Sequence, residues 1–166
     1  GFENGNLGNW VDEGGNYTKQ VSTTSPAVGS YCLELKGDPG NNIHNDGLSH
    51  AFPSSTPKSA SFYIKTSHTN SYGGYVNIGN GSDLDGLLYL YQYYGSLYIN
   101  GTYYTTYSAN QWHYIELRNI DFIAKTFDVY MDGTLLIAGR AFYNTSLTSV
   151  DKINLYKYYN NASYPD

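Results

Sequence analysis

Tyrosine is the residue type in this chain best suited to contact a ligand. Of the 166 residues 20 are tyrosine, and eight of these fall in the stretch LLYLYQYYGSLYINGTYYTTY, Leu87 to Tyr107. A phenol combines a flat apolar ring with a hydroxyl that donates and accepts hydrogen bonds, a combination that suits amphipathic ligands such as sugars. The direction in which each ring points therefore decides whether the stretch is core or binding surface.

Aliphatic and tyrosine side chains alternate along this stretch, which predicts strands with one aliphatic and one phenolic face. The aliphatic face should belong to the core. On either side of a turn expected at Gly95-Ser96, the predicted outward residues are Tyr89, Tyr91, Tyr93 and Tyr98. The same alternation in two earlier segments adds Tyr63, Lys65, Tyr75 and Asn77. If these strands are neighbours, the residues form a broad patch of rings edged with amides.

The same rings have a second interpretation. Aromatic pairs on neighbouring strands stabilise a sheet by roughly 0.2 to 1 kcal/mol each, so the tyrosines can be architecture that needs no ligand. From the sequence, a sugar-binding face and a structural face therefore remain alternatives.

The elements that must position these rings are predicted to be short strands. Asn-Gly and Asp-Gly dipeptides, which favour tight hairpin turns, recur along the chain, and segments of period two lie between them. No segment keeps the helical spacing of apolar residues over three turns. We therefore expect an all-β fold with little or no helix, a two-sheet antiparallel sandwich or jelly roll, built as one domain over residues 1–166.

Composition excludes several classes of partner. The net charge is -5 and the chain has no cluster of lysine and arginine, so binding to the phosphate backbone of a nucleic acid is not expected. No run of eighteen apolar residues is present to span a membrane. Cys32 is the only cysteine, so no internal disulfide can form.

Four stretches occur in the order seen in one known family: GFENGNLGNW, SYCLELKG, QWHYIELRNIDFIAKTFDVYMDG and SVDKINLY. With them the chain resembles the concanavalin A-like, laminin G-like jelly rolls of secreted bacterial and archaeal proteins. The resemblance implies twelve to fourteen strands in two curved sheets. It also implies a monomeric, extracellular or cell-surface module, excised from a larger protein, that serves carbohydrate binding or adhesion beside another domain.

The resemblance further implies one structural calcium ion. Family members use an acid of an opening Phe-Glu pair and an aspartate of a closing strand, which correspond here to Glu3 and Asp166. Backbone carbonyls and water would have to complete the six to eight oxygens that calcium requires. The family pattern continues into a final strand, so that strand either follows beyond Asp166 or is contributed or lost elsewhere. The alternative is that Glu3 is a solvated surface acid.

Catalysis is not expected. Glycosidases need two carboxyl groups on either side of the scissile bond, and the Glu-x-Asp-x-Glu runs of related sandwich glucanases are absent. The leading hypothesis is a non-catalytic carbohydrate-binding module that binds a polysaccharide through the tyrosine-rich face, as an accessory to a glycoside hydrolase or similar enzyme. The alternative is a structural or adhesion domain of a cell-surface, filament or viral protein.

Overall fold

The computed structural model describes residues 2–37, 46–80 and 83–157, except for the side chains of 83–85. All regular structure in these ranges is β, with thirteen strands and no helix. The same ranges thus contain no helix long and apolar enough to cross a membrane. The predicted all-β antiparallel sandwich is confirmed, and the strand count lies within the range that the family resemblance implied.

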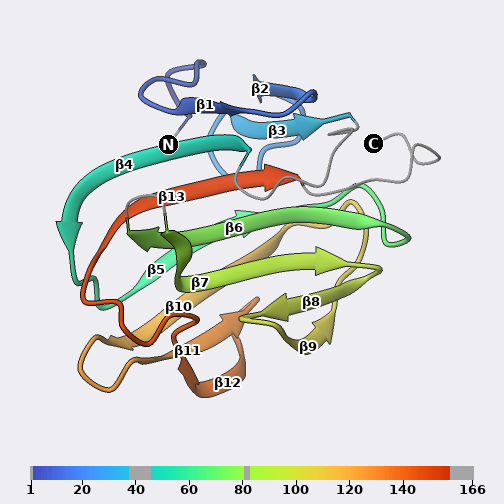
Figure 1. Ribbon diagram of the computed structural model, residues 1–166. Helices are drawn as coiled ribbons and strands as arrows, with labels where there is room; N and C mark the ends of the chain where they lie inside the picture. Colours follow the sequence, from blue (N-terminus) through green and yellow to red (C-terminus); the bar gives the residue numbers. More distant parts are fainter. Residues whose placement is uncertain (1, 38–45, 81–82, 158–166) are drawn as a thin grey trace.

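The larger sheet has seven strands, each antiparallel to its neighbours. In spatial order the strands are β1 (Val11–Gly14), β4 (Gly47–Ser55), β13 (Val150–Lys157), β6 (Tyr72–Asn80), β7 (Asp83–Tyr93), β8 (Ser96–Ile99) and β9 (Thr102–Thr106), as Figure 1 shows. In this sheet β13, the last strand of the described residues, lies between the earlier strands β4 and β6.

The second sheet lies behind the first in Figure 1. In spatial order its four strands are β12 (Thr134–Ala141), β11 (Thr126–Met131), β10 (His113–Asp121) and β5 (Ala60–Ile64). A separate two-stranded sheet is formed by β2 (Thr18–Ser22) and β3 (Cys32–Lys36). The two larger sheets are the layers of the sandwich.

The core lies between these two layers. Leu88 and Leu90 of β7 and Ile99 of β8 are fully buried, and they belong to one cluster with Leu117 of β10 and Val129 of β11. Fully burying such a side chain contributes roughly 1.5 to 3 kcal/mol. A slip of one residue would move each of them to the opposite face, so this burial fixes the register of the strands. The prediction that the aliphatic face is core is confirmed.

Two tight turns connect the strands that carry most of the tyrosines. Between β7 and β8 the turn residues are Tyr94 and Gly95, with φ of 46° and 75°, where the sequence suggested Gly95-Ser96. Between β8 and β9 they are Asn100 and Gly101, with φ of 49° and 78°. Two successive positive φ angles are typical of the type I′ turn, whose twist matches that of a hairpin.

Candidate functional site

Five tyrosines from five different strands lie directly opposite one another on the outer face of the seven-stranded sheet. The register of β13, β6, β7, β8 and β9 aligns them across the sheet, perpendicular to the strands. We call this set the tyrosine row; its members, in order, are Tyr156, Tyr75, Tyr91, Tyr98 and Tyr103.

Rings in the row stack on one another. The ring centroids of Tyr156 and Tyr75 are 4.8 Å apart, those of Tyr75 and Tyr91 are 5.3 Å apart, and those of Tyr91 and Tyr98 are 4.8 Å apart. The planes of these pairs differ by 23°, 10° and 5°, whereas Tyr103 meets Tyr98 edge-on at 65°. Stacked rings cover one another's faces, so Tyr75 and Tyr91 turn their edges, not their faces, away from the sheet.

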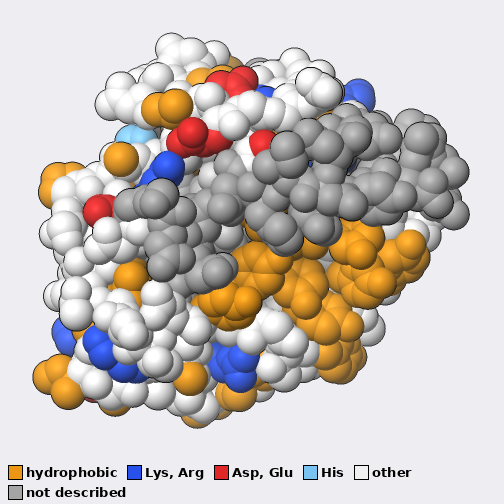
Figure 2. All heavy atoms as spheres, viewed as in Figure 1, with side chains coloured by type: hydrophobic (Ala, Val, Ile, Leu, Met, Phe, Trp, Pro, Cys, Tyr) orange, Lys and Arg blue, Asp and Glu red, His pale blue; other side chains and the backbone are white. Residues whose placement is uncertain are grey.

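Exposure rises along the row from β13 to β9. Tyr156 is 0% exposed and Tyr75 is 3% exposed, Tyr91 and Tyr98 are half-buried, and Tyr103 is 51% exposed. Figure 2 shows hydrophobic side chains, tyrosine among them, gathered on the surface over the β7 to β9 region. A ligand would therefore meet the β8 and β9 end of the row first.

Further tyrosines surround the row. The Tyr89 ring lies 5.2 Å from that of Tyr91 and 5.4 Å from that of Tyr143, which follows β12. Tyr93 meets Tyr98 edge-on at 6.1 Å and packs against Tyr72 at 4.7 Å. The rings thus form one continuous network on the outer face of the sheet.

Burial holds two phenols of this network, those of Tyr91 and Tyr156, in their neutral form. Burial raises the pKa of Tyr91, and the neighbouring phenols of Tyr98, Tyr143 and Tyr93 raise it further. Burial also raises the pKa of Tyr156. A neutral phenol both donates and accepts hydrogen bonds, as a sugar hydroxyl does.

Six of the eight residues predicted for the site share this face: Tyr75, Asn77, Tyr89, Tyr91, Tyr93 and Tyr98. Asn77 lies beside Asn154 of β13 and Tyr89 of β7, and it is 1% exposed. Asn77 and Tyr75 are therefore deep residues, since β6 is an inner strand with rings of β7 and β13 packed over it.

The other two predicted residues, Tyr63 and Lys65, are not brought to this face. Tyr63 lies on β5, in the four-stranded sheet, opposite Tyr114 of β10 with ring centroids 4.7 Å apart. Lys65 follows β5 directly, and its ammonium group lies over the ring of Trp112. The assumption that β5 neighbours β6 is wrong, because β5 pairs with β10.

Comparisons with known proteins agree with this fold. No family model matches the chain, and no curated protein matches it. Among solved structures, a sialidase superposes with a TM-score of 0.69 at 15% identity, over 95% of this chain and 14% of the sialidase. The globular domain of T. cruzi calreticulin gives a TM-score of 0.59 at 14% identity, over 93% of this chain and 81% of that one.

An endo-beta-1,4-glucuronan lyase from the fungus Trichoderma reesei gives a TM-score of 0.58 at 16% identity, over 94% of this chain and 82% of the lyase. At such low identity these likenesses show the fold alone, which is the β-sandwich. Membership in the laminin G-like family stays a prediction.

Sequence reasoning missed two members of the row, Tyr156 and Tyr103. Tyr156 could have been found, because Ile153 and Leu155 alternate with Asn154 and Tyr156 in the same way as in β7. Tyr103 has an adjacent tyrosine at 104, so alternation alone does not tell which of the two faces outward.

The predicted calcium ligands are only partly described. The Glu3 carboxylate accepts a hydrogen bond from the Ser30 amide at 3.0 Å, so it already ties the amino-terminal segment to the segment before β3. Asp166 lies outside the described residues. Within them, no group of three or more histidine, cysteine, aspartate and glutamate side chains could hold a metal ion. A calcium ion bound by Glu3 and Asp166 stays a prediction.

Two charged residues of β10, Glu116 and Arg118, bind each other. The guanidinium of Arg118 donates to both carboxylate oxygens of Glu116, at 2.8 and 2.9 Å, and lies over the ring of Tyr130. Glu116 and Arg118 thus form an ion pair within β10, on the four-stranded sheet.

Proposed function

We propose that this domain is a non-catalytic carbohydrate-binding module that holds a polysaccharide against the outer face of the seven-stranded sheet. The observation that carries the proposal is the tyrosine row, five in-register rings that end in an exposed tyrosine at the sheet edge. A polymer lying along the row would cross β7, β8 and β9 in turn.

Two kinds of contact support this binding mode. The face of a pyranose presents apolar C–H groups, which suit the exposed ring of Tyr103. The edges of the sugar present hydroxyls, which suit the hydroxyls of the half-buried Tyr91 and Tyr98. Because these groups carry no charge, the fitting ligand is a neutral or weakly anionic polysaccharide.

The affinity of a single site should be low. Covering some 40 Å² of apolar ring at roughly 25 cal/mol per Å² contributes about 1 kcal/mol. The three accessible rings of the row, those of Tyr91, Tyr98 and Tyr103, would give about 3 kcal/mol, which corresponds to a dissociation constant of several millimolar before the costs of binding are subtracted. Useful binding then requires an extended polymer or neighbouring modules. We therefore place the domain in a larger extracellular protein, as an accessory to a glycoside hydrolase or similar enzyme.

One observation favours the second candidate, a structural or adhesion domain without a sugar site. The rings of Tyr75, Tyr91 and Tyr98 are stacked, so each ring covers a face of its neighbour. Aromatic pairs of this kind stabilise a sheet without any ligand. The two candidates differ only in whether the exposed end of the row binds sugar.

A binding experiment separates them. The domain would be incubated with insoluble cellulose, chitin and xylan, and with a glycan array, and the bound fraction measured for three proteins. The wild type is compared with Tyr98→Ala plus Tyr103→Ala, and with Tyr63→Ala as the matched control. Tyr63 is 42% exposed, against 51% for Tyr103, but it lies on the other sheet.

We expect the wild type and Tyr63→Ala to be retained equally on at least one polysaccharide. The double substitution removes about 2 kcal/mol of ring contact and should lower retention by more than tenfold. Retention that survives the double substitution would remove the proposed site. An absence of wild-type binding to every glycan would favour the structural role.

A further inference from the structure

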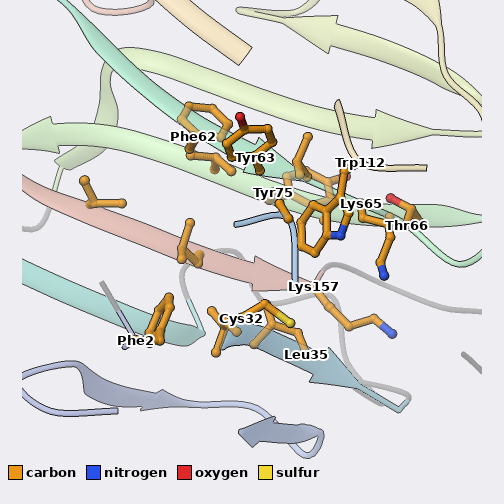
Figure 3. Close-up of a pocket in the computed structure, with 18 of the residues that line it drawn as sticks. Phe2, Cys32, Leu35, Phe62, Tyr63, Lys65, Thr66, Tyr75, Trp112 and Lys157 are labelled. Carbon is orange, nitrogen blue, oxygen red and sulfur yellow. The ribbon is translucent and has the colours of Figure 1, made fainter. Parts of the chain in front are cut away.

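A second feature lies on the inner side of the seven-stranded sheet, and of the tyrosine row only Tyr75 borders it. It is a cavity of about 560 Å³ bordered by β3, β5, β6 and β13 (Figure 3). Most of its lining is apolar, with Leu33 and Leu35 from β3, Phe62 and Ile64 from β5, and Ile153 from β13. Its size is that of an ordinary ligand site, which ranges from roughly 300 to 1,000 Å³.

The edge of β5 borders this cavity. Every residue from Ala60 to Lys65 lines it, including those whose side chains point to opposite faces of the sheet. Consecutive residues can all line one space only where the backbone edge itself borders that space. Within residues 2–37, 46–80 and 83–157, β5 pairs with β10 alone, so its other edge has no strand beside it.

A second strand edge borders the same cavity. Cys32 and Leu33 are adjacent in β3 and both line it, and in the described part of the chain β3 pairs with β2 alone. The cavity thus lies between the four-stranded sheet, whose strand β5 lines it, and the separate sheet of β2 and β3, whose strand β3 lines it. Uncovered strand edges carry backbone amide and carbonyl groups that can pair with another extended chain.

We propose that this cavity is a docking site for an extended segment of a partner protein, which adds as a strand to the free edge of β5. Each alternate side chain of the segment would fill the apolar cavity, and its backbone would supply hydrogen bonds to the edge, as in other cases of strand addition. All described strand pairs of the sandwich are antiparallel. We therefore expect the docked strand to be antiparallel to β5 as well.

Charge at one end of the cavity defines the segment further. Lys65 follows β5 directly and lies at the end of the cavity toward which β5 runs, and Phe2 and Phe62 lie at the other end (Figure 3). The Lys65 ammonium group donates to the backbone carbonyl of Ser25 at 3.5 Å. An antiparallel strand begins at this lysine end. The fitting partner therefore has acidic residues first and alternating apolar residues after them.

The only cysteine of the chain provides the assay, because Cys32 is one of the residues that line the cavity. Burial raises the pKa of this thiol, so its reaction with a disulfide reagent would be followed under alkaline conditions. The whole chain is tested with two synthetic peptides of the same composition. One has two acidic residues followed by alternating valine and threonine, and the other has the acidic residues last.

We expect the acid-first peptide to slow the reaction of Cys32 at least tenfold and the acid-last peptide to slow it much less. Lys65→Glu should abolish the difference, whereas Lys58→Glu, on an exposed lysine outside the cavity, should leave it unchanged. If Lys65→Glu does not fold, as judged by circular dichroism, the two peptides on the wild type still decide the matter.

Equal protection by both peptides, or by neither, would overturn the proposal. Protection that grows with protein concentration in the absence of peptide would overturn it too, because a second copy of this chain would then be the occupant. Neither result depends on sugar binding, so the outcome is independent of the proposed function.

Discussion

Tyr91 and Tyr98 lie directly opposite each other on β7 and β8, with ring centroids 4.8 Å apart and planes 5° from parallel. Parallel, offset rings of this kind contribute roughly 0.5 to 1.5 kcal/mol beyond the area that they bury. In this pair the stacked rings would serve stability and the hydroxyls would serve sugar binding, so substitutions here can separate the two roles of the row.

Substitutions at Tyr91 test this separation. Tyr91→Ala removes a half-buried ring and its stacking partners, and should lower the free energy of unfolding by about 2 kcal/mol. Tyr91→Phe keeps the ring, so stability in urea should change by less than about 0.5 kcal/mol. If the hydroxyl binds sugar, Tyr91→Phe should nevertheless weaken retention on the polysaccharide. Equal stability losses for the two variants would contradict the importance of the stack.

Asn100 should be the most sensitive turn residue of the tyrosine-bearing strands. Its amide nitrogen donates to the carbonyls of Leu87 and Ala141, at 3.1 and 2.9 Å, and its amide oxygen accepts from the Tyr89 amide at 2.8 Å. Because its φ is 49°, Asn100→Gly loses only these bonds, whereas Asn100→Ala also acquires backbone strain.

Thermal and urea unfolding would measure both variants. We expect losses of about 2 kcal/mol for Asn100→Gly and about 3 kcal/mol for Asn100→Ala. Asn100 also begins an Asn-x-Thr sequon, but its amide is engaged on both sides and should not accept a glycan. A glycan on Asn100, or a stable Asn100→Ala variant, would contradict the bonding described above.

Glu13 should account for part of the acid sensitivity of the domain. A hydrogen bond from the Ser49 hydroxyl and then one from Lys152 lower the pKa of Glu13 below its usual value of 4.5. A carboxyl group whose pKa is lowered by folding stabilises the fold above its unfolded pKa. That stabilisation is lost as pH falls through the folded pKa. The loss should therefore occur below about pH 4.5.

Melting temperatures of the wild type and Glu13→Gln between pH 7 and about pH 3 would measure this effect. The variant should be the less stable protein at pH 7, and the two curves should converge at low pH. Ser49→Ala removes the largest cause of the shift and should reduce the difference in part. Curves that stay parallel over the whole range would show that Glu13 does not contribute.

Local alternation predicted the faces of strands well and their neighbours poorly. The assignment of Leu88 and Leu90 to the core and of Tyr91 to the outer face needed only the two-residue period, and burial of the leucines fixed it. The placement of Tyr63 beside Tyr75 needed the order of strands, which depends on long-range pairing that no local pattern contains. For the same reason the insertion of β13 next to β6, which puts Tyr156 at the head of the row, was not foreseen.

The stacked geometry was also beyond the reach of the sequence. Alternation shows that the rings of Tyr91 and Tyr98 share a face, but it does not show whether they lie flat on the sheet or stand against each other. That choice depends on side-chain packing between adjacent strands, which the register of β7 and β8 determines.

Gly47 of β4 prevents the tyrosine row from continuing past Tyr156, so the row can be extended only at its other end. A Cβ atom at Gly47 would come within 2.3 Å of the Leu155 carbonyl oxygen and 2.7 Å of the Tyr17 hydroxyl oxygen, so no ring can follow Tyr156 on that side. The opposite end, Tyr103, stands on the edge strand β9. Any lengthening of the series, whether by evolution or by design, must therefore begin with a new strand laid beside Tyr103.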